Sequence, residues 1–385
     1  MTSCTNLQEK TKINELISKV ETHLTPSVVI EGKQDTLFTI DERMEYYKVP
    51  GLSIAIIFNG KIQWAKGYGY TSYDSTKMID ENTLFQAASI SKPVAAMAAL
   101  YLVQEGRISL DMDVNKYLRD WKIVENRFTE KEKVTLRRLL SHSAGLTVSG
   151  FKGYAEGEDV PDITRILNGE PPANNNSIRP DTVPGQLYRY SGGGYTVAQK
   201  MLTDITGIPF QAFMQQTVLS RIGMSNSYFY QPLPGQFHNN ASIGHNSKGD
   251  PVEGKWHTYP ELAAAGLWTT PTDLAKFAIE VQQSLKGLSN KVLSKELTEQ
   301  MVTRYFKHKG LGFDVIGDGD SIRFGHGGGN KGYRCQSVAF KNFGQGAVIM
   351  TNSDNGSDLM SEVLRSISWT YNWNIFPPAV RKIGQ

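Results

Sequence analysis

A serine and a lysine three residues apart, Ser89 and Lys92, stand at the start of a strongly apolar stretch. Within residues 94–103 only Tyr101 has a polar atom in its side chain, and such a run predicts a helix that is buried on all sides. Pro93 places the start of this helix close to the serine, because proline is tolerated in the first helical turn, where its missing amide hydrogen is not needed.

The spacing of Ser89 and Lys92 suggests nucleophilic catalysis, because residues at i and i+3 share one face of a helix. Burial lowers the pKa of a lysine, so a neutral amine could take the proton of the serine hydroxyl. The alternative is structural, with a serine that caps the helix and a lysine that reaches out to solvent. The same spacing recurs at Ser149 and Lys152 in a predicted loop, so spacing alone does not decide between these interpretations.

The composition limits the class of protein. The chain has 385 residues, of which 39% are hydrophobic and 21% charged, which is typical of a globular protein with a large core. The formal net charge is only +3 and the chain has no block of lysine and arginine, so nucleic acid is not an expected partner. The two distant cysteines, Cys4 and Cys335, predict neither a disulfide framework nor a metal site, and we expect no cofactor.

The cellular compartment and the oligomeric state stay open. Residues 94–103 are too few to cross a bilayer, and the N-terminus lacks the charged and then apolar layout of a signal peptide. Residues 6–24 instead predict an amphipathic helix. We therefore expect no transmembrane segment, and a location in the cytoplasm, or in the periplasm or cell envelope if an export signal has been trimmed.

The predicted elements run from strands to helices and back to strands. Residues 52–70 predict two strands joined at Asn59-Gly60, a dipeptide typical of a tight hairpin. Helices predominate between about 85 and 225, including residues 195–207 and 210–224, and strands return before a final helix at about 357–371. This order predicts a mixed α/β (α+β) fold, with an antiparallel sheet flanked by N- and C-terminal helices and an inserted, mostly helical subdomain.

We expect two parts with the active site between them. Residues 1–84 and 263–385 would form the sheet part, and residues 85–262 the mostly helical insertion. The long connections 147–187 and 231–262 lie within the insertion, and loops of this length usually serve a site or a lid. We therefore expect them to shape the pocket.

Several stretches resemble, in the same order, motifs of the serine β-lactamase and penicillin-binding protein family. Besides the serine and lysine that open the apolar helix, these stretches are VPGLSIAII, LLSHSAGL, PGQLYRYSGGGY, IGMSNSYF, TTPTDLAKF and FGHGGGNKGY. The likeness extends from about Val49 to Asn352 and is greatest to the class C-like esterases and D-amino-acid peptidases. It implies a β-lactamase/DD-peptidase-like fold with the active site between an α/β part and a helical part.

The resemblance also implies catalytic roles. Ser89 would be the nucleophile that forms an acyl-enzyme, and Lys92 and Tyr190 would remove its proton. A phenolate is stabilised by a nearby ammonium, so these two side chains could act together as one base. The backbone amides of Ser89 and Gly329 would form the oxyanion hole, which holds the charge that develops on the substrate.

Two positions depart from the usual family pattern. Gly192 stands where the family usually has an asparagine, which leaves room for a differently shaped acyl group. His326, Gly327 and Gly328 replace the usual Lys-Thr-Gly, as in the esterase and D-aminopeptidase branches. A histidine is mostly neutral near pH 7 and is therefore a weaker partner for a substrate carboxylate than lysine. We expect these four residues to contact the substrate.

The expected activity is that of a serine hydrolase acting on esters or on D-amino-acid amides or peptides, so the partner would be a small molecule or a short peptide. A β-lactamase or penicillin-binding DD-carboxypeptidase is the next alternative, and a non-catalytic protein that binds cell-wall fragments is another. Acyl transfer to an alcohol or amine shares every step up to release of the acyl group, so the sequence does not separate it from hydrolysis.

Two other patterns are interpreted as structural. Gly327-x-Gly329-x-x-Gly332 matches a dinucleotide-binding fingerprint, but a predicted strand follows it where that motif needs a helix. His142 lies between two serines, and we expect it to pack and to form hydrogen bonds. The seven histidines show no His-Glu-x-x-His pattern, so no metal site is predicted.

Overall fold

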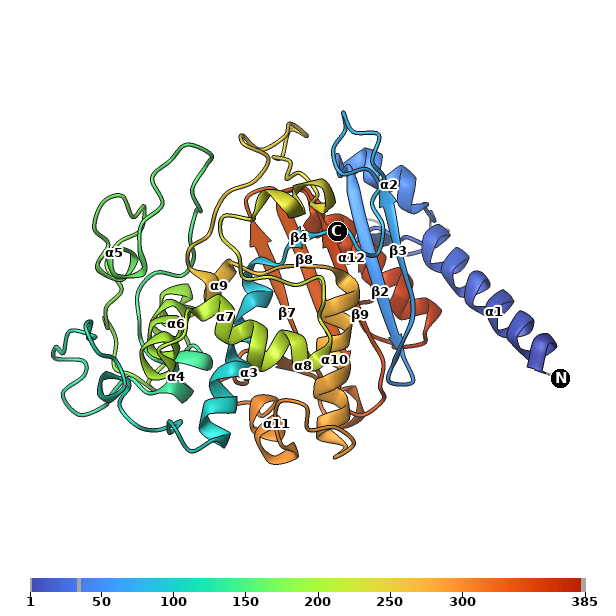
Figure 1. Ribbon diagram of the computed structural model, residues 1–385. Coiled ribbons are helices and arrows are strands. Elements are labelled where there is room, and N and C mark those ends of the chain that lie inside the picture. Colours follow the sequence, from blue (N-terminus) through green and yellow to red (C-terminus); the bar gives the residue numbers. More distant parts are fainter. Residues whose placement is uncertain (1, 33–35, 382–385) are drawn as a thin grey trace.

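The computed structural model describes residues 2–32 and 36–381, and its centre is a six-stranded antiparallel sheet with helices on both faces (Figure 1). The strand order is β3-β2-β9-β8-β7-β6. The strands are β2 (Gly51–Phe58), β3 (Lys61–Gly69), β6 (Asp314–Ile316), β7 (Arg323–Asn330), β8 (Tyr333–Phe340) and β9 (Gly346–Thr351). The predicted antiparallel sheet is confirmed, and so is the mixed α/β class of the fold.

The hairpin between β2 and β3 turns at the predicted dipeptide. Asn59 and Gly60 both have positive φ, at 53° and 69°, which is the backbone of a tight two-residue turn. Strand β2 is buried along nearly its whole length because layers pack on both of its faces. Ile54 and its neighbours two residues away face the core beside the terminal helices, whereas Ala55 and Ile57 face the larger core beside α3 and α10.

The two ends of the chain cover one face of the sheet. This layer contains α1 (Thr2–Thr22), α2 (Ile40–Tyr47) and α12 (Gly356–Thr370), and α12 packs against the other two helices and against β8 and β9. The predicted N-terminal and C-terminal helices are therefore confirmed. A parallel pair, β1 (Val28–Ile30) with β10 (Ala379–Arg381), joins the two ends and was not predicted.

Helices cover the other face and continue beyond the sheet. They are α3 (Ser91–Gln104), α4 (Leu136–Leu140), α5 (Ile163–Asn168), α6 (Gly192–Thr206), α7 (Phe210–Met214), α8 (Ser220–Ile222), α9 (Leu262–Ala265), α10 (Pro271–Leu285) and α11 (Lys295–Met301). Helix α3 has a buried side chain at nearly every position, as predicted from its continuous apolar sequence. A short pair, β4 (Phe85–Gln86) with β5 (Trp268–Thr269), lies beside its start.

Two helices differ from their predicted extents. Helix α6 begins at Gly192, before the predicted start, because the Ser191 hydroxyl caps it by accepting a hydrogen bond from the Gly194 amide at 2.9 Å. The predicted helix 210–224 is divided, because a π-helical turn (Gln215–Leu219) separates α7 from α8.

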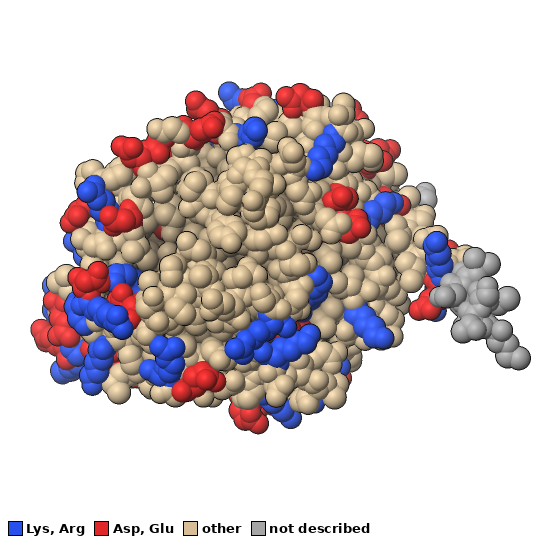
Figure 2. All heavy atoms as spheres, in the orientation of Figure 1, with Lys and Arg blue, Asp and Glu red and all other residues tan. Residues whose placement is uncertain are grey.

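The predicted division into a sheet part and a helical insertion stays a prediction. All six strands of the large sheet lie within residues 1–84 and 263–385, and α3 to α8 lie within residues 85–262. Charged side chains of both signs lie around the margin of the face in Figure 2, while the centre of that face carries few of either sign. Neither sign therefore dominates this face.

Candidate active site

The hydroxyl of Ser89 lies where two long polar side chains converge. It accepts hydrogen bonds from Lys92 Nζ at 3.0 Å and from Tyr190 Oη at 2.9 Å. Ser89 itself lies in a single turn of 3₁₀-helix (Ala88–Ile90) that leads directly into α3. The structure thus brings together the three residues that were predicted to be catalytic.

The backbone before Ser89 is strained. Ala88 has a φ of 48°, in the left-handed region that residues with a side chain seldom adopt. Its neighbour across the site is β7, which passes so closely that a Cβ at Gly328 would lie 2.3 Å from the Ala87 carbonyl oxygen and 2.4 Å from Cys335 Sγ. Glycine at position 328 therefore permits the strand to lie against the turn that carries Ser89.

Lys92 is buried and has no carboxylate partner recorded among the described residues. Its Nζ donates to the carbonyl oxygen of Ala264 in α9 at 2.8 Å as well as to Ser89. Burial lowers the pKa of Lys92 to about 7, and the cation of Lys309 contributes to this shift. A substantial fraction of the amine is therefore neutral near pH 7 and able to accept a proton.

Tyr190 reaches Ser89 from the segment that precedes α6. Its ring stacks on that of His142 with centroids 4.2 Å apart, and His142 Nδ1 accepts a hydrogen bond from the Ser191 amide at 3.1 Å. These contacts agree with the interpretation of His142 as a packing and hydrogen-bonding residue. They also hold the phenol in position above the nucleophile.

The expectation of a stabilised phenolate at Tyr190 is wrong for this site. Burial raises the pKa of Tyr190, and this effect exceeds the opposing effects of the Ser89 hydrogen bond and the Lys309 cation. The phenol therefore stays protonated near pH 7. Of the two side chains, the amine of Lys92 is the one that can accept a proton at neutral pH.

Lys309 was not predicted from the sequence to belong to the site. This side chain is buried, forms an ion pair with Asp314, and places its Nζ 5.4 Å from the centroid of the Tyr190 ring. Its cation lowers the pKa of Lys92, as noted above, and also that of His326. A lysine directly before the apolar stretch Gly310–Phe313 was the only signal, and it matches no motif.

His326 lies on β7 with its ring buried beside the site. Its Nδ1 contacts the carbonyl oxygen of Gly327 at 2.5 Å, and its Nε2 has no hydrogen-bond partner among the described residues. Burial lowers the pKa of His326 well below its usual value, and the cation of Lys309 adds to this effect. The imidazole is therefore neutral near pH 7, as expected. A neutral imidazole interacts more weakly with a carboxylate than lysine does.

The remaining predicted residues lie on β7 and at the start of α6. Gly329 follows Gly328 on β7. The oxyanion hole formed by the backbone amides of Gly329 and Ser89 stays a prediction. At Gly192, a Cβ would lie 3.0 Å from the Phe151 ring and 3.1 Å from the Ser149 carbonyl oxygen. A side chain at position 192 would therefore require residues 149–151 to shift by a few tenths of an ångström, a feature that only the structure reveals.

The comparison with protein families identifies the chain. The model of the family described as Beta-lactamase matches residues 39–366. The chain belongs to the beta-lactamase family. This confirms the resemblance that the motifs around Ser89 and Tyr190 predicted.

Curated relatives in this family are distant. The chain is 27% identical over 285 residues to Protein flp of Staphylococcus aureus (strain MRSA252), an alignment that covers 68% of this chain and 53% of that protein. It is 24% identical over 314 residues to the Teichoic acid D-alanine hydrolase of Staphylococcus aureus (strain NCTC 8325 / PS 47), covering 80% of this chain and 74% of that protein. The chain thus spans about half the length of the Protein flp sequences that it matches.

Solved structures with the same fold include a penicillin-binding protein homologue and a class C beta-lactamase. The octameric penicillin-binding protein homologue from Pyrococcus abyssi has a TM-score of 0.71 and 24% identity, covering 86% of this chain and 76% of that one. A class C beta-lactamase has a TM-score of 0.67 and 21% identity, covering 85% and 93%. The predicted β-lactamase/DD-peptidase-like fold is confirmed by these likenesses. None of the helices that the structure describes is long and apolar enough to span a bilayer.

Proposed function

We propose that the protein is a serine hydrolase that forms an acyl-enzyme on Ser89. The observation that carries this proposal is the pair of hydrogen bonds, at 3.0 Å from Lys92 and 2.9 Å from Tyr190, that converge on the Ser89 hydroxyl. A nucleophile within hydrogen-bonding distance of a base is the arrangement that covalent catalysis requires. Membership of the beta-lactamase family supports the same chemistry.

The environment of each side chain suggests its part in the reaction. Neutral Lys92 takes the proton of Ser89 as the oxygen bonds to the substrate carbonyl carbon, and the amides of Ser89 and Gly329 stabilise the developing oxyanion. Tyr190, which stays protonated, then donates its proton to the leaving group and recovers one from Lys92. A water molecule finally attacks the ester of Ser89 and releases the acyl group.

We propose an ester or amide of a D-amino acid as the substrate. Gly192 lacks the amide side chain with which the family usually holds a substrate amide, and neutral His326 is a weak partner for a carboxylate. Both features favour a small acyl group without a second amide or a free carboxylate. The name of the related Teichoic acid D-alanine hydrolase supports a D-alanyl ester in particular.

The test compares substrates at equal concentration. We expect kcat/KM for a D-alanyl ester or a short-chain p-nitrophenyl ester to exceed that for a chromogenic cephalosporin by about 10- to 100-fold or more, since each missing hydrogen bond to a substrate costs about 1–3 kcal/mol. Cleavage of the cephalosporin at least as fast as the esters would contradict the proposed substrate class. A covalent adduct that never turns over would instead favour a binding protein, and a product formed with an added alcohol would indicate acyl transfer.

The cation of Lys309 leads to a prediction about pH dependence. Because it lowers the pKa of Lys92, the change Lys309→Met should raise that pKa. The rise of kcat/KM with pH should then occur at higher pH, and ester hydrolysis at pH 7 should fall several-fold. The measurement is the pH profile of kcat/KM in both proteins.

Lys307→Met is the matched control, because Lys307 is an exposed lysine two residues away that lies 5.6 Å from the centroid of the Tyr188 ring. Its profile should coincide with that of the wild type. An unmoved profile in the Lys309 variant would refute the electrostatic role of this lysine.

A further inference from the structure

The position of the Lys92 amine depends on one short helix. Its Nζ donates to the Ala264 carbonyl oxygen in α9 at 2.8 Å, and its other recorded hydrogen bond is the one to Ser89. Gly192, at the start of α6, offers no side chain to the amine. Helix α9 has only four residues, too few to be stable by its own hydrogen bonds. Contacts from outside α9 must therefore fix the Ala264 carbonyl.

Two amide side chains from neighbouring elements hold α9. Gln199, on α6, accepts a hydrogen bond from the Ala263 amide at 3.0 Å, and its Nε2 donates to the Pro260 carbonyl oxygen at 3.1 Å. Asn330, the last residue of β7, donates through Nδ2 to the Ala265 carbonyl oxygen at 3.1 Å. The residues directly before and after the carbonyl that holds the amine are therefore tied to α6 and to β7.

Both amides are buried, so water cannot readily replace the hydrogen bonds that they form. Gln199 and Asn330 are each only 5% exposed. Asn330 Nδ2 also donates to Gln86 Oε1 in β4 at 2.7 Å, and Gln86 Nε2 donates to the His257 carbonyl oxygen at 2.8 Å, in the segment before α9. Removal of either amide would leave buried polar groups unpaired, and a displacement of α9 would relieve that cost.

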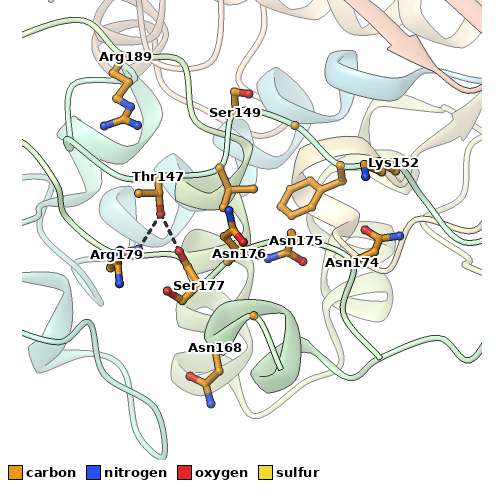
Figure 3. Close-up of a pocket in the computed structure, with 14 residues that line it drawn as sticks. Thr147, Ser149, Lys152, Asn168, Asn174, Asn175, Asn176, Ser177, Arg179 and Arg189 are labelled. Carbon is orange, nitrogen blue, oxygen red and sulfur yellow. Dashed lines mark hydrogen bonds between the residues drawn. The ribbon is translucent and has the colours of Figure 1, made fainter. Parts of the chain in front are cut away.

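Residues 147–152, which border the start of α6, take no part in this arrangement. The Ser149 carbonyl oxygen accepts a hydrogen bond from the Gly192 amide at 3.1 Å, and a cavity of about 880 Å³ lies between this segment and residues 174–179 (Figure 3). None of the described residues that line the cavity is recorded in a hydrogen bond with Lys92 or with α9. The contacts that fix the amine therefore come from Gln199 and Asn330.

We propose that Gln199 and Asn330 are positioning residues that orient the Lys92 amine through α9. The inference rests on the proposed function, in which neutral Lys92 accepts the proton of Ser89. A neutral amine has two N–H groups and one lone pair. When one N–H donates to the Ala264 carbonyl oxygen, the lone pair can face the Ser89 hydroxyl. The proton then passes from Oγ to Nζ as Oγ bonds to the substrate carbonyl carbon, whose oxygen takes the displaced electron pair.

The test follows the labelling of Ser89 by a serine-reactive phosphonate, which needs an activated hydroxyl but no particular acyl group. Gln199→Met keeps the approximate volume of the side chain and removes both of its hydrogen bonds to the segment of α9. We expect the maximal labelling rate to fall by about 10- to 100-fold, because a small misplacement of a base is costly. The phosphonate concentration that gives half of this rate should stay unchanged.

The pH profile of labelling separates a positioning role from a loss of stability. The Ala264 carbonyl favours the ammonium form of Lys92, so its displacement should lower the pKa of Lys92 and move the rise of labelling to lower pH. Lys309→Met should move the rise in the opposite direction. The titratable side chains around Lys92 are unchanged in Gln199→Met, and they are Lys309, Tyr190, Tyr195, His142, His326 and, at the N-cap of α9, Glu261.

Gln282→Met is the matched control. Gln282 is buried in α10, and its Nε2 donates to the carbonyl oxygens of Phe340 at 2.8 Å and Gln345 at 2.9 Å, at the end of β8 distant from Ser89. This variant should lose stability as Gln199→Met does, but it should label at the wild-type rate and with the wild-type pH profile.

The inference and the proposed function can fail separately. Unchanged labelling in Gln199→Met, or slower labelling without a shift of the pH profile, would overturn the positioning role. A wild type that resists the phosphonate would contradict the proposed function, and the pKa of Lys92, followed by NMR of the lysine ε-carbons in both proteins, would still test the inference. Asn330→Leu repeats the test from β7 if Gln199→Met is unfolded.

Discussion

Replacing Ser89 with alanine is expected to lower kcat for hydrolysis of a short-chain p-nitrophenyl ester by about 10⁴-fold or more, to the rate that binding alone sustains. The reason is that the Ser89 hydroxyl is the single oxygen on which both Lys92 and Tyr190 converge. Removal of a nucleophile from such a unit usually removes nearly all of its rate enhancement. The measurement is single-turnover and steady-state hydrolysis by the two proteins.

A serine on the opposite side of the sheet provides the control for Ser89. Ser361 is exposed on α12, and its hydroxyl donates to the Ser357 carbonyl oxygen at 2.9 Å. Ser361→Ala should therefore hydrolyse the ester at the wild-type rate. Intact-mass spectrometry after treatment with a serine-reactive phosphonate should show one adduct in the wild type and none in Ser89→Ala. An undiminished ester rate in Ser89→Ala would reject the acyl-enzyme mechanism.

The second large effect is expected for Lys92→Ala, which should slow acylation by about 10³-fold, within the range that general-base catalysis contributes. The alanine variant should fold, because burial lowers the pKa of Lys92 from 10.5 to about 7 and the buried cation therefore costs stability at neutral pH. Between these pH values the unfolded chain binds more protons at Lys92 than the folded chain does. The free energy of unfolding therefore rises with pH in this range. Removal of the side chain removes this cost.

Wild-type kcat/KM should rise with pH through about 7, as the Lys92 amine loses its proton and becomes able to accept that of Ser89. Glu261 titrates in a similar pH range, because burial raises its pKa to about 8. The profile is therefore also measured in Glu261→Gln. The rise should persist there and disappear in Lys92→Ala. Partial rescue of Lys92→Ala by an added alkylamine would support proton transfer, and normal acylation without any amine would contradict it.

The sequence predicted those parts of the molecule that depend on local patterns. The hairpin at Asn59-Gly60 and the buried helix after Ser89 follow from turn chemistry and hydrophobic patterning, which act over a few residues. Ser89 and Lys92 could be paired because they lie one helical turn apart. The pair β1 and β10 could not be predicted, because it joins two strands of three residues from the two ends of the chain.

The rest of the site depends on tertiary placement. Tyr190 entered the prediction only through the family motifs, since nothing in its spacing brings it to Ser89. Lys309 was missed because its segment carries no motif, and Phe151 because its segment carries only the spacing of Ser149 and Lys152, which was interpreted as a loop. Both reach the site only when the chain is folded. The expected phenolate at Tyr190 is wrong because the degree of burial, which raises its pKa, cannot be read from the order of residues.

The pairing of β2 with β9 has a consequence for synthesis on the ribosome. One edge of β2 pairs with β3, which follows it directly, but its other edge pairs with β9, with Leu52 opposite Thr351. The hairpin β2-β3 therefore emerges early and waits, with apolar side chains uncovered and one edge unpaired, until nearly all of the chain has been made. Such distant pairing makes folding slow, and it makes the nascent hairpin a natural client for chaperones.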